Sequence, residues 1–183
     1  LIRSADVIHH NMRPGAAERL GFGLDDVRQL NDGIVYLYSP GWGSSGPYAS
    51  RQSFAPLLSI YCGIGFEVAG ELNPPLWPVA NEDSGNGLWG AIGILIGLHR
   101  RAQGFSGAQY IENPQLNAAL QHISHQVWTE DGALANAQRL DPMQYGFSSL
   151  DRLYETADGW ICLSACTPES FDALSSVVGE LAI

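Results

Sequence analysis

The stretch ADVIHHNMRPGAAERLGFGLDDVRQLNDGIVYLYS (residues 5–39) decides the fold class. Its two ends, residues 5–11 and 33–39, are short apolar runs with β-branched residues, which is typical of buried strands. Between them we expect two short helices, over residues 14–21 and 24–31. A strand, a helical crossover and a second strand at this spacing predict part of a layered α/β sheet.

The alternation of helices and strands continues up to about residue 132. A loop over residues 40–50 is indicated by its glycines and prolines, and residues 71–78 form a second, proline-stiffened link. The remaining elements expected before residue 133 are three helices and one strand: a helix over 54–70, a helix from about Asp83 to about Arg101, the strand Gln109–Glu112, and a helix over 116–132.

The last third of the chain predicts a second, smaller unit. Periodicity is lost over residues 133–149, which we interpret as a linker. A hairpin follows over 150–165, with its turn at Asp158-Gly159, and a helix over 167–179 begins with a Thr167 cap. We therefore expect one α/β domain over 1–132 and the start of an α+β domain over 150–183.

Composition excludes some functions. The chain of 183 residues is 45% hydrophobic, and its formal net charge is −10, which argues against nucleic-acid and anionic-membrane surfaces as partners. All nine cationic residues are arginine, which offers forked donors for phosphate or carboxylate. Three cysteines without a metal or redox spacing, and no visible signal peptide, predict a cytoplasmic protein.

The stretch NEDSGNGLWGAIGILIGLHRR (81–101) raises the question of reactivity. Asp83 or Ser84 would serve as an ordinary helix cap. Alternatively, Asp83 is a nucleophile toward an activated acyl group, held ionised by the helix dipole, with Gly85 and Gly87 leaving room for substrate.

Farther along the same helix, Gly90, Gly93 and Gly97 lie on one face and predict close backbone packing. The apolar run Leu88–Leu98 is too short to span a bilayer, which takes about 20 residues.

Other polar residues leave alternatives open. The turn with Arg13 and Arg19 suits an anion at a helix start, or is an ordinary surface turn. His9 and His10 point to opposite faces of a strand and cannot easily share a metal ion. His122 and His125 share a helix face, but no acidic or thiol partner is in view, so no metal site is predicted.

Taken together, these segments resemble the class III CoA-transferases (CaiB/BaiF type), the family of formyl-CoA and carnitine CoA-transferases. Residues 5–49 are similar to the family block in which a strand ends in an acidic-Asn-aromatic-Arg-Pro-Gly turn, followed by a strand and a loop closed by Gly-Pro-Tyr. YETADGWICLSA (154–165) resembles a second block, which opens the small domain. The resemblance implies a partial Rossmann-like large domain, an interlocked homodimer and no permanently bound cofactor.

The resemblance also implies a site and a mechanism. Asp83 matches the family's catalytic aspartate, which forms an acyl anhydride and then an aspartyl-CoA thioester, with coenzyme A and a carboxylic acid as substrates. Backbone N–H groups near Gly85 and Gly87 are candidates for the oxyanion site. The residues implied in binding CoA are Asn11, Met12, Arg13, Arg19, Arg51 and Gln52.

Departures from the family pattern bear on specificity and leave competing functions. Met12 stands where the family has an aromatic residue, His10 where it has an acid, and Phe54-Ala55 where formyl-CoA transferases carry Tyr-Glu. One alternative is an α-methylacyl-CoA racemase, which resembles this chain but needs a histidine near Phe54. The other is a truncated CoA-binding remnant. The opening and closing residues suggest a fragment, which we expect to be inactive alone.

Overall fold

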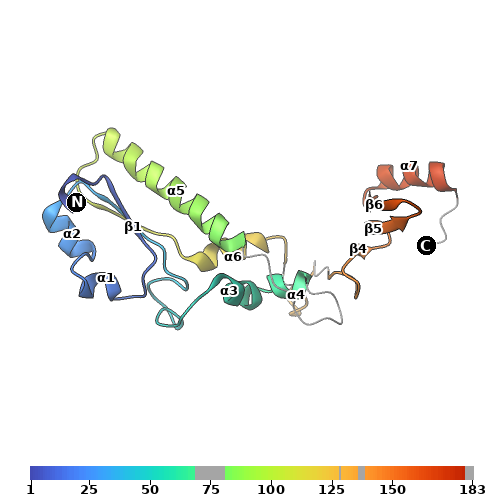
Figure 1. Cartoon of the computed structure of the whole chain (residues 1–183), viewed down its shortest axis with the longest axis horizontal. Coiled ribbons are helices and arrows are strands. Elements are labelled where there is room, and N and C mark those ends of the chain that lie inside the picture. The colour runs from blue at the N-terminus through green and yellow to red at the C-terminus, as the bar shows by residue number, and fades with distance from the viewer. Residues whose placement is uncertain (69–80, 128, 136–138, 180–183) are drawn as a thin grey trace. The chain divides into compact units, whose positions relative to one another are not determined.

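The structure is a computed structural model that describes residues 1–68, 81–127, 129–135 and 139–179. The chain forms two compact units (Figure 1). The sheet unit comprises Leu1–Ile64 and Pro78–His125, and the hairpin unit comprises Gly65–Trp77 and Gln126–Ile183. The boundaries that we expected for functional domains, 1–132 and 150–183, remain a prediction.

The sheet unit is built on three parallel strands in the order β1 (Val7–His10), β2 (Val35–Tyr38) and β3 (Gln109–Glu112). In the register, Ile8 lies beside Tyr36, which lies beside Tyr110. All four residues of the central strand β2 are buried, as expected for a parallel sheet covered on both faces. The predicted α/β class is confirmed.

The crossover between β1 and β2 contains α1 (Ala16–Arg19) and α2 (Leu24–Leu30), and a short helix, η1 (Ile2–Ser4), precedes β1. Helix α1 begins two residues later than the expected Pro14, because Gly15 adopts a left-handed conformation with φ 75°. The Ala16 N–H donates to the Arg13 carbonyl at 3.0 Å, so Arg13 to Ala16 form a turn before the helix.

The expected helix over 54–70 is divided. It forms α3 (Ala55–Cys62) and α4 (Ile64–Val68), separated at Gly63, where φ is 98°. A left-handed glycine satisfies the last carbonyls of a helix and ends it, which explains the break. Residues 69–70 and the proline-rich link over 71–78 lie outside the described residues.

Two further helices flank β3. Helix α5 (Asn81–Ala102) starts two residues before the expected Asp83, and α6 (Gln115–His122) ends ten residues before the expected residue 132. Beyond α6 the chain turns at Thr129, whose N–H donates to the Ala133 carbonyl at 2.9 Å. Gly132 in this turn has φ 77°, which a continuous helix does not allow.

The glycine face of α5 packs against the sheet, as the spacing predicts, and α5 lies along the sheet in Figure 1. A Cβ on Gly90 would stand 3.1 Å from Leu37 Cδ2, and one on Gly97 would stand 2.8 Å from Val35 Cγ1. Gly93 is similarly close to Ile111. These three glycines let the helix axis approach the strands more closely than side chains would permit.

The opposite face of the sheet carries a hydrophobic cluster of its own. Val27, Ile34, Tyr36 and Tyr38 are buried together, with Phe22 and Ile8 packed around them. Helices α1 and α2 lie on this side, so α5 and the crossover helices enclose the sheet (Figure 1). The carboxyl ends of β1 and β2 are therefore held by packing on both faces.

The hairpin unit contains β4 (Gly146–Ser148), β5 (Asp151–Thr156), β6 (Gly159–Ser164) and α7 (Pro168–Val178). The predicted hairpin is confirmed, with Thr156 beside Gly159 at its turn. The predicted cap of α7 is also confirmed, because Thr167 Oγ1 accepts from the Ser170 N–H at 3.2 Å. Strand β4 falls in the segment that we expected to be only a linker.

Candidate active site

A polar cavity of about 370 Å³ lies where the carboxyl ends of β1 and β2 meet the start of α5. This edge is the usual ligand position in open parallel sheets. Nine residues line the cavity: His9, Asn11, Ser39, Gly41, Ser53, Asp83, Asn86, Gly87 and Gln115. They come from β1 and the residue that follows it, the segment after β2, and the helices α5 and α6, so segments distant in sequence form one site.

Asp83 is the single acidic residue among those that line this cavity. It is exposed and lies in the first turn of α5, so the prediction that it or Ser84 caps the helix is wrong. The helix already begins at Asn81, and the Asp83 carboxylate instead accepts a hydrogen bond from Gln115 Nε2 of α6.

The neighbouring carboxylate of Glu82 has the opposite environment. Glu82 is fully buried, and both of its carboxylate oxygens lack a hydrogen-bond partner among the described residues. Burial, followed by the charge of Glu82, raises the pKa of the Cys62 thiol on α3. The two adjacent acids are therefore separated: Glu82 faces the packed interior and Asp83 faces the cavity.

A second, smaller cavity of about 200 Å³ adjoins the first, and the two share Asn11, Gly41 and Ser53. The second cavity gathers five of the six residues implied in CoA binding: Asn11, Met12, Arg13, Arg51 and Gln52. Part of its lining comes from the loop after β2. In this loop, Arg51 lies over the Tyr48 ring at 4.5 Å, and Trp42 Nε1 donates to the Gln52 carbonyl at 3.0 Å.

The sixth residue, Arg19, does not line either cavity. It lies on α1, close to the turn, where a Cβ on Gly15 would stand 3.1 Å from Arg19 Nη1. A ligand that extends from the second cavity over this turn would reach it. The role of Arg19 stays a prediction.

The two glycines assigned to the oxyanion site differ from each other. Gly87 lines the cavity, and a Cβ there would meet nothing within 4 Å. Gly85 faces α6, where a Cβ would stand 3.3 Å from His122 Nε2. Both lie beyond the first turn of α5, where helical N–H groups bond to carbonyls four residues earlier. The N–H groups without an acceptor carbonyl within α5 belong to its first turn.

The two histidines of β1 lie on opposite faces, as strand alternation predicts. His10 contacts the core face: its Nε2 is 2.8 Å from the Tyr36 hydroxyl, which donates to the Phe22 carbonyl at 3.1 Å. Burial is the main cause that lowers the pKa of His10. His9 lies on the α5 face and lines the cavity with Asp83.

Five cavity residues were not singled out from the sequence: Ser39, Gly41, Ser53, Asn86 and Gln115. Asn86 is one helical turn after Asp83, so its position was the one signal available in the sequence. Gln115 and Ser53 are brought in by contacts over long sequence separations. His9 was considered as a metal ligand alone, although alternation places it on the side opposite His10.

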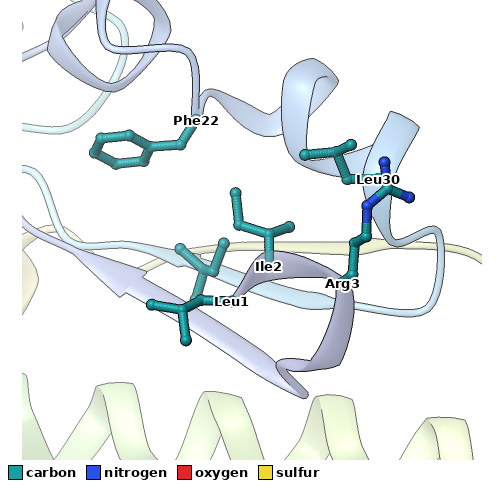
Figure 2. A pocket seen from close by; sticks show the side chains of 6 residues that line it. Leu1, Ile2, Arg3, Phe22 and Leu30 are labelled. Carbon is teal, nitrogen blue, oxygen red and sulfur yellow. The ribbon is translucent and has the colours of Figure 1, made fainter.

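A pocket near the amino-terminal residues has a different character. It has a volume of about 580 Å³ and is lined mainly by apolar side chains, among them Leu1, Ile2, Phe22 and Leu30 (Figure 2). Arg3 is its one charged side chain. With no nucleophile or acid–base group in its lining, this pocket offers no chemistry of its own.

Among the described residues, no helix is long and apolar enough to cross a membrane. In the same residues, no three histidine, cysteine or acidic side chains gather in a way that would hold a metal ion.

Comparison with known proteins identifies the family of this chain. The profile of "CoA-transferase family III" matches residues 1–182, and the chain belongs to this family.

Named relatives agree with this assignment. The chain is 30% identical, over 98% of its length, to the beta subunit of succinyl-CoA–L-malate CoA-transferase from Chloroflexus aurantiacus, of which it covers 45%. It is 35% identical, over 67% of its length, to formyl-CoA:oxalate CoA-transferase from Streptomyces avermitilis, of which it covers 28%. The chain thus spans less than half the length of these relatives.

The fold itself is similar to a solved one. A crystal structure of a CAIB/BAIF family protein from Brucella suis matches 97% of this chain with a TM-score of 0.74 and 22% identity, and the chain covers 47% of that protein. The predicted family and fold class are therefore confirmed.

Proposed function

We propose that the whole protein is an acyl-CoA:carboxylate CoA-transferase in which Asp83 is the nucleophile. The observation that carries the proposal is the placement of Asp83 in a polar cavity that adjoins the arginine-lined cavity through shared residues. A thioester bound with its CoA moiety in the second cavity would extend its acyl carbonyl toward the first. Family membership supports the same reaction.

The reaction proceeds by two anhydrides and one thioester. The Asp83 carboxylate attacks the carbonyl carbon of the donor acyl-CoA, the C–S bond breaks, and CoA leaves as a thiolate. The thiolate then attacks the aspartyl carbonyl of the mixed anhydride, which releases the donor acid and forms an aspartyl-CoA thioester. Dividing one difficult transfer into such steps lowers each barrier.

The acceptor acid completes the exchange by the same chemistry in reverse. Its carboxylate attacks the aspartyl-CoA thioester and expels the thiolate, which attacks the acceptor carbonyl of the new anhydride. Acceptor acyl-CoA forms, and the Asp83 carboxylate is regenerated with no net gain or loss of a proton. The free first-turn N–H groups of α5 are the candidate donors to the oxyanion of each tetrahedral intermediate.

The arginines of the second cavity serve as CoA ligands in this proposal. Arg13 and Arg51 are exposed there, and a guanidinium can form two parallel hydrogen bonds to a phosphate group. Met12 replaces an aromatic contact with a flexible thioether, which packs against an adenine ring less rigidly. CoA enters and leaves as a substrate.

The racemase alternative is disfavoured by the residue at the required position. Ser53 lines the cavity just before Phe54, where that reaction needs a histidine base. A serine hydroxyl without a neighbouring base does not abstract a proton at neutral pH. The remnant alternative is disfavoured by the intact pairing of Asp83 with Gln115.

The family resemblance further supports a homodimer. The free cysteines Cys62, Cys162 and Cys166 fit the proposed cytoplasmic location. Sedimentation of the whole protein at several concentrations tests the dimer. A monomer at all concentrations would contradict it.

The covalent intermediate gives the direct test of the function. The whole protein is incubated with a panel of acyl-CoAs, quenched, treated with hydroxylamine and analysed by peptide mass spectrometry. We expect a hydroxamate on the peptide that contains Asp83, and none after incubation with free CoA. A label on another residue, or no label with any acyl-CoA, would contradict the proposed nucleophile.

A further inference from the structure

The cavity at Asp83 contains a second group that neither the family assignment nor the mechanism uses. His9 comes from the sheet, whereas Asp83 comes from the helix, and both line the cavity. His9 pairs in register with Leu37, which packs against Gly90 of α5. This register places the imidazole on the α5 face of the sheet, where the cavity is.

Ser39 fixes the orientation of this imidazole. His9 Nε2 lies 3.1 Å from Ser39 Oγ, and Ser39 is almost fully buried. The Ser39 N–H in turn donates to the His10 carbonyl at 2.9 Å. When the Ser39 hydroxyl donates to Nε2, the proton of a neutral imidazole is on Nδ1, which is then a donor available to a ligand.

The charges around the cavity suggest what that ligand is. Among the described lining residues, Asp83 is the one acid, and His9 is the one side chain that can become a cation. Arg13 and Arg51 line the neighbouring cavity instead. A substrate with a non-reacting carboxylate is repelled by Asp83 whenever Asp83 is a free carboxylate, and a donor on the opposite element would offset this repulsion.

The lining also limits the rest of the substrate. Besides the two titratable groups it consists of amides, hydroxyls and glycines, namely Asn11, Gln115, Asn86, Ser39, Ser53, Gly41 and Gly87. Asn86 adds a buried Oδ1 without a partner among the described residues. An aliphatic chain would gain no apolar contact from these groups and would leave their polar atoms unsatisfied. The cavity thus favours a short acid with a second polar end.

We propose that His9, oriented by Ser39, is a specificity-determining residue that binds the non-reacting carboxylate of a short dicarboxylic acid exchanged at Asp83. The proposal rests on the proposed function for the identity of the reacting end. The imidazole N–H donates to the distal carboxylate, while the proximal carboxylate reacts. His9 takes no part in bond making or breaking.

The test compares two acids of equal chain length, succinate and butyrate, in the whole protein. Acetyl-CoA is the donor for transfer assays, and calorimetry measures binding of each acid without turnover. We expect the unmodified protein to prefer succinate. His9→Leu should weaken succinate binding and its kcat/KM by about 10- to 100-fold, the range of a charge-assisted hydrogen bond, and should leave butyrate nearly unchanged.

Two further variants separate recognition from structure. His9→Gln keeps a side-chain N–H donor and should recover part of the succinate preference. His99→Leu changes an exposed histidine at the other end of α5 and should behave as the unmodified protein.

Each result bears on one of the two proposals. Equal loss for succinate and butyrate in His9→Leu, or an unmodified protein that prefers butyrate, would overturn the role of His9. Loss of exchange of the α-hydrogen of acyl-CoA with deuterium oxide in His9→Leu would identify it as a base and also overturn that role. Succinate binding that depends on His9, without an Asp83 adduct, would retain this inference and contradict the proposed function.

Discussion

The two ends of helix α5 differ in the environment of their residues. At its start, Asp83 is exposed in a polar cavity and is held by one side-chain hydrogen bond from Gln115. Toward its other end, Gly93 and Gly97 lie against Ile111 and Val35, with no space for a further carbon atom. One helix thus combines an open end, where a ligand fits, with a closed end that fixes its position.

This difference shows how the site acquires its rigidity. The glycine face holds α5 against two strands of a sheet that is buried on both sides. Because the helix is a rigid rod, contacts near Gly97 determine where Asp83 lies relative to the ends of β1 and β2. A reactive group that must be positioned to within about 0.5 Å benefits from such an element. The following predictions test this division, starting with the largest effect.

Asp83→Asn in the whole protein should lower CoA transfer by about 10⁴-fold or more, because the amide is not a competent nucleophile and nucleophile removal has effects of this size. Steady-state transfer from acetyl-CoA measures the loss. The matched control is Glu82→Gln, which changes the adjacent, buried carboxylate and should leave most of the activity. Comparable losses in both variants would show that the two acids act together, contrary to their separate environments.

Arg51→Ala should weaken CoA binding by about 1.5–3 kcal/mol, since a charge-assisted hydrogen bond to phosphate is lost from the second cavity. Calorimetry with free CoA measures this change. Arg19→Ala should weaken binding less than Arg51→Ala, because Arg19 lies on α1 and does not line the cavity. Arg28→Ala on α2 provides a control that removes an exposed arginine whose ion pair is with Asp25. An Arg28 effect as large as that of Arg51 would indicate a general charge effect.

Gly97→Ala should destabilise the whole protein by about 1–3 kcal/mol, the usual cost of overpacking, because the new Cβ would lie 2.8 Å from Val35 Cγ1 and 3.0 Å from Val35 Cγ2. Gly87→Ala at the open end of the same helix meets nothing within 4 Å and should stabilise the protein by up to about 1 kcal/mol through helix propensity. Thermal and urea unfolding measure both. Equal effects at the two glycines would remove the distinction between the open and the closed end.

Much of the closed end was predictable from the sequence, and less of the open end. The spacing of Gly90, Gly93 and Gly97 indicates close packing directly, because helical periodicity depends on local sequence. The contact of Gln115 with Asp83 and the position of Ser53 depend on how distant segments meet, which no local pattern specifies. The start of α5 was also misplaced by two residues, since several polar residues there are equally suitable as caps.

Helix breaks were missed for a related reason. Gly63 stands in an apolar run that is compatible with a continuous helix, and its left-handed φ of 98° becomes evident in three dimensions alone. The elements of the hairpin unit were easier to predict, because the Asp158-Gly159 turn and the Thr167 cap are local signals. The sequence thus predicted elements well where their cause is local, and it named the candidate site residues through resemblance to a family.

The smallest effect is expected at the last turn of α5. Arg101 Nη2 lies 2.6 Å from Asp6 Oδ1, and Arg101 Nη1 donates to the Gly33 carbonyl at 3.2 Å, so the side chain connects the helix to the residues just before β1 and β2. The pair is partly exposed, with the Asp6 side chain 73% accessible, and such ion pairs contribute about 0–1 kcal/mol.

Arg101→Gln should therefore lower the free energy of unfolding by less than about 1 kcal/mol. The loss should shrink further in about 0.5 M salt, because screening weakens the pair in the unmodified protein. Transfer activity should stay unchanged, since the glycine face continues to hold the helix. A large loss of activity at unchanged stability would instead mean that Arg101, and not the glycine contacts, determines the position of Asp83.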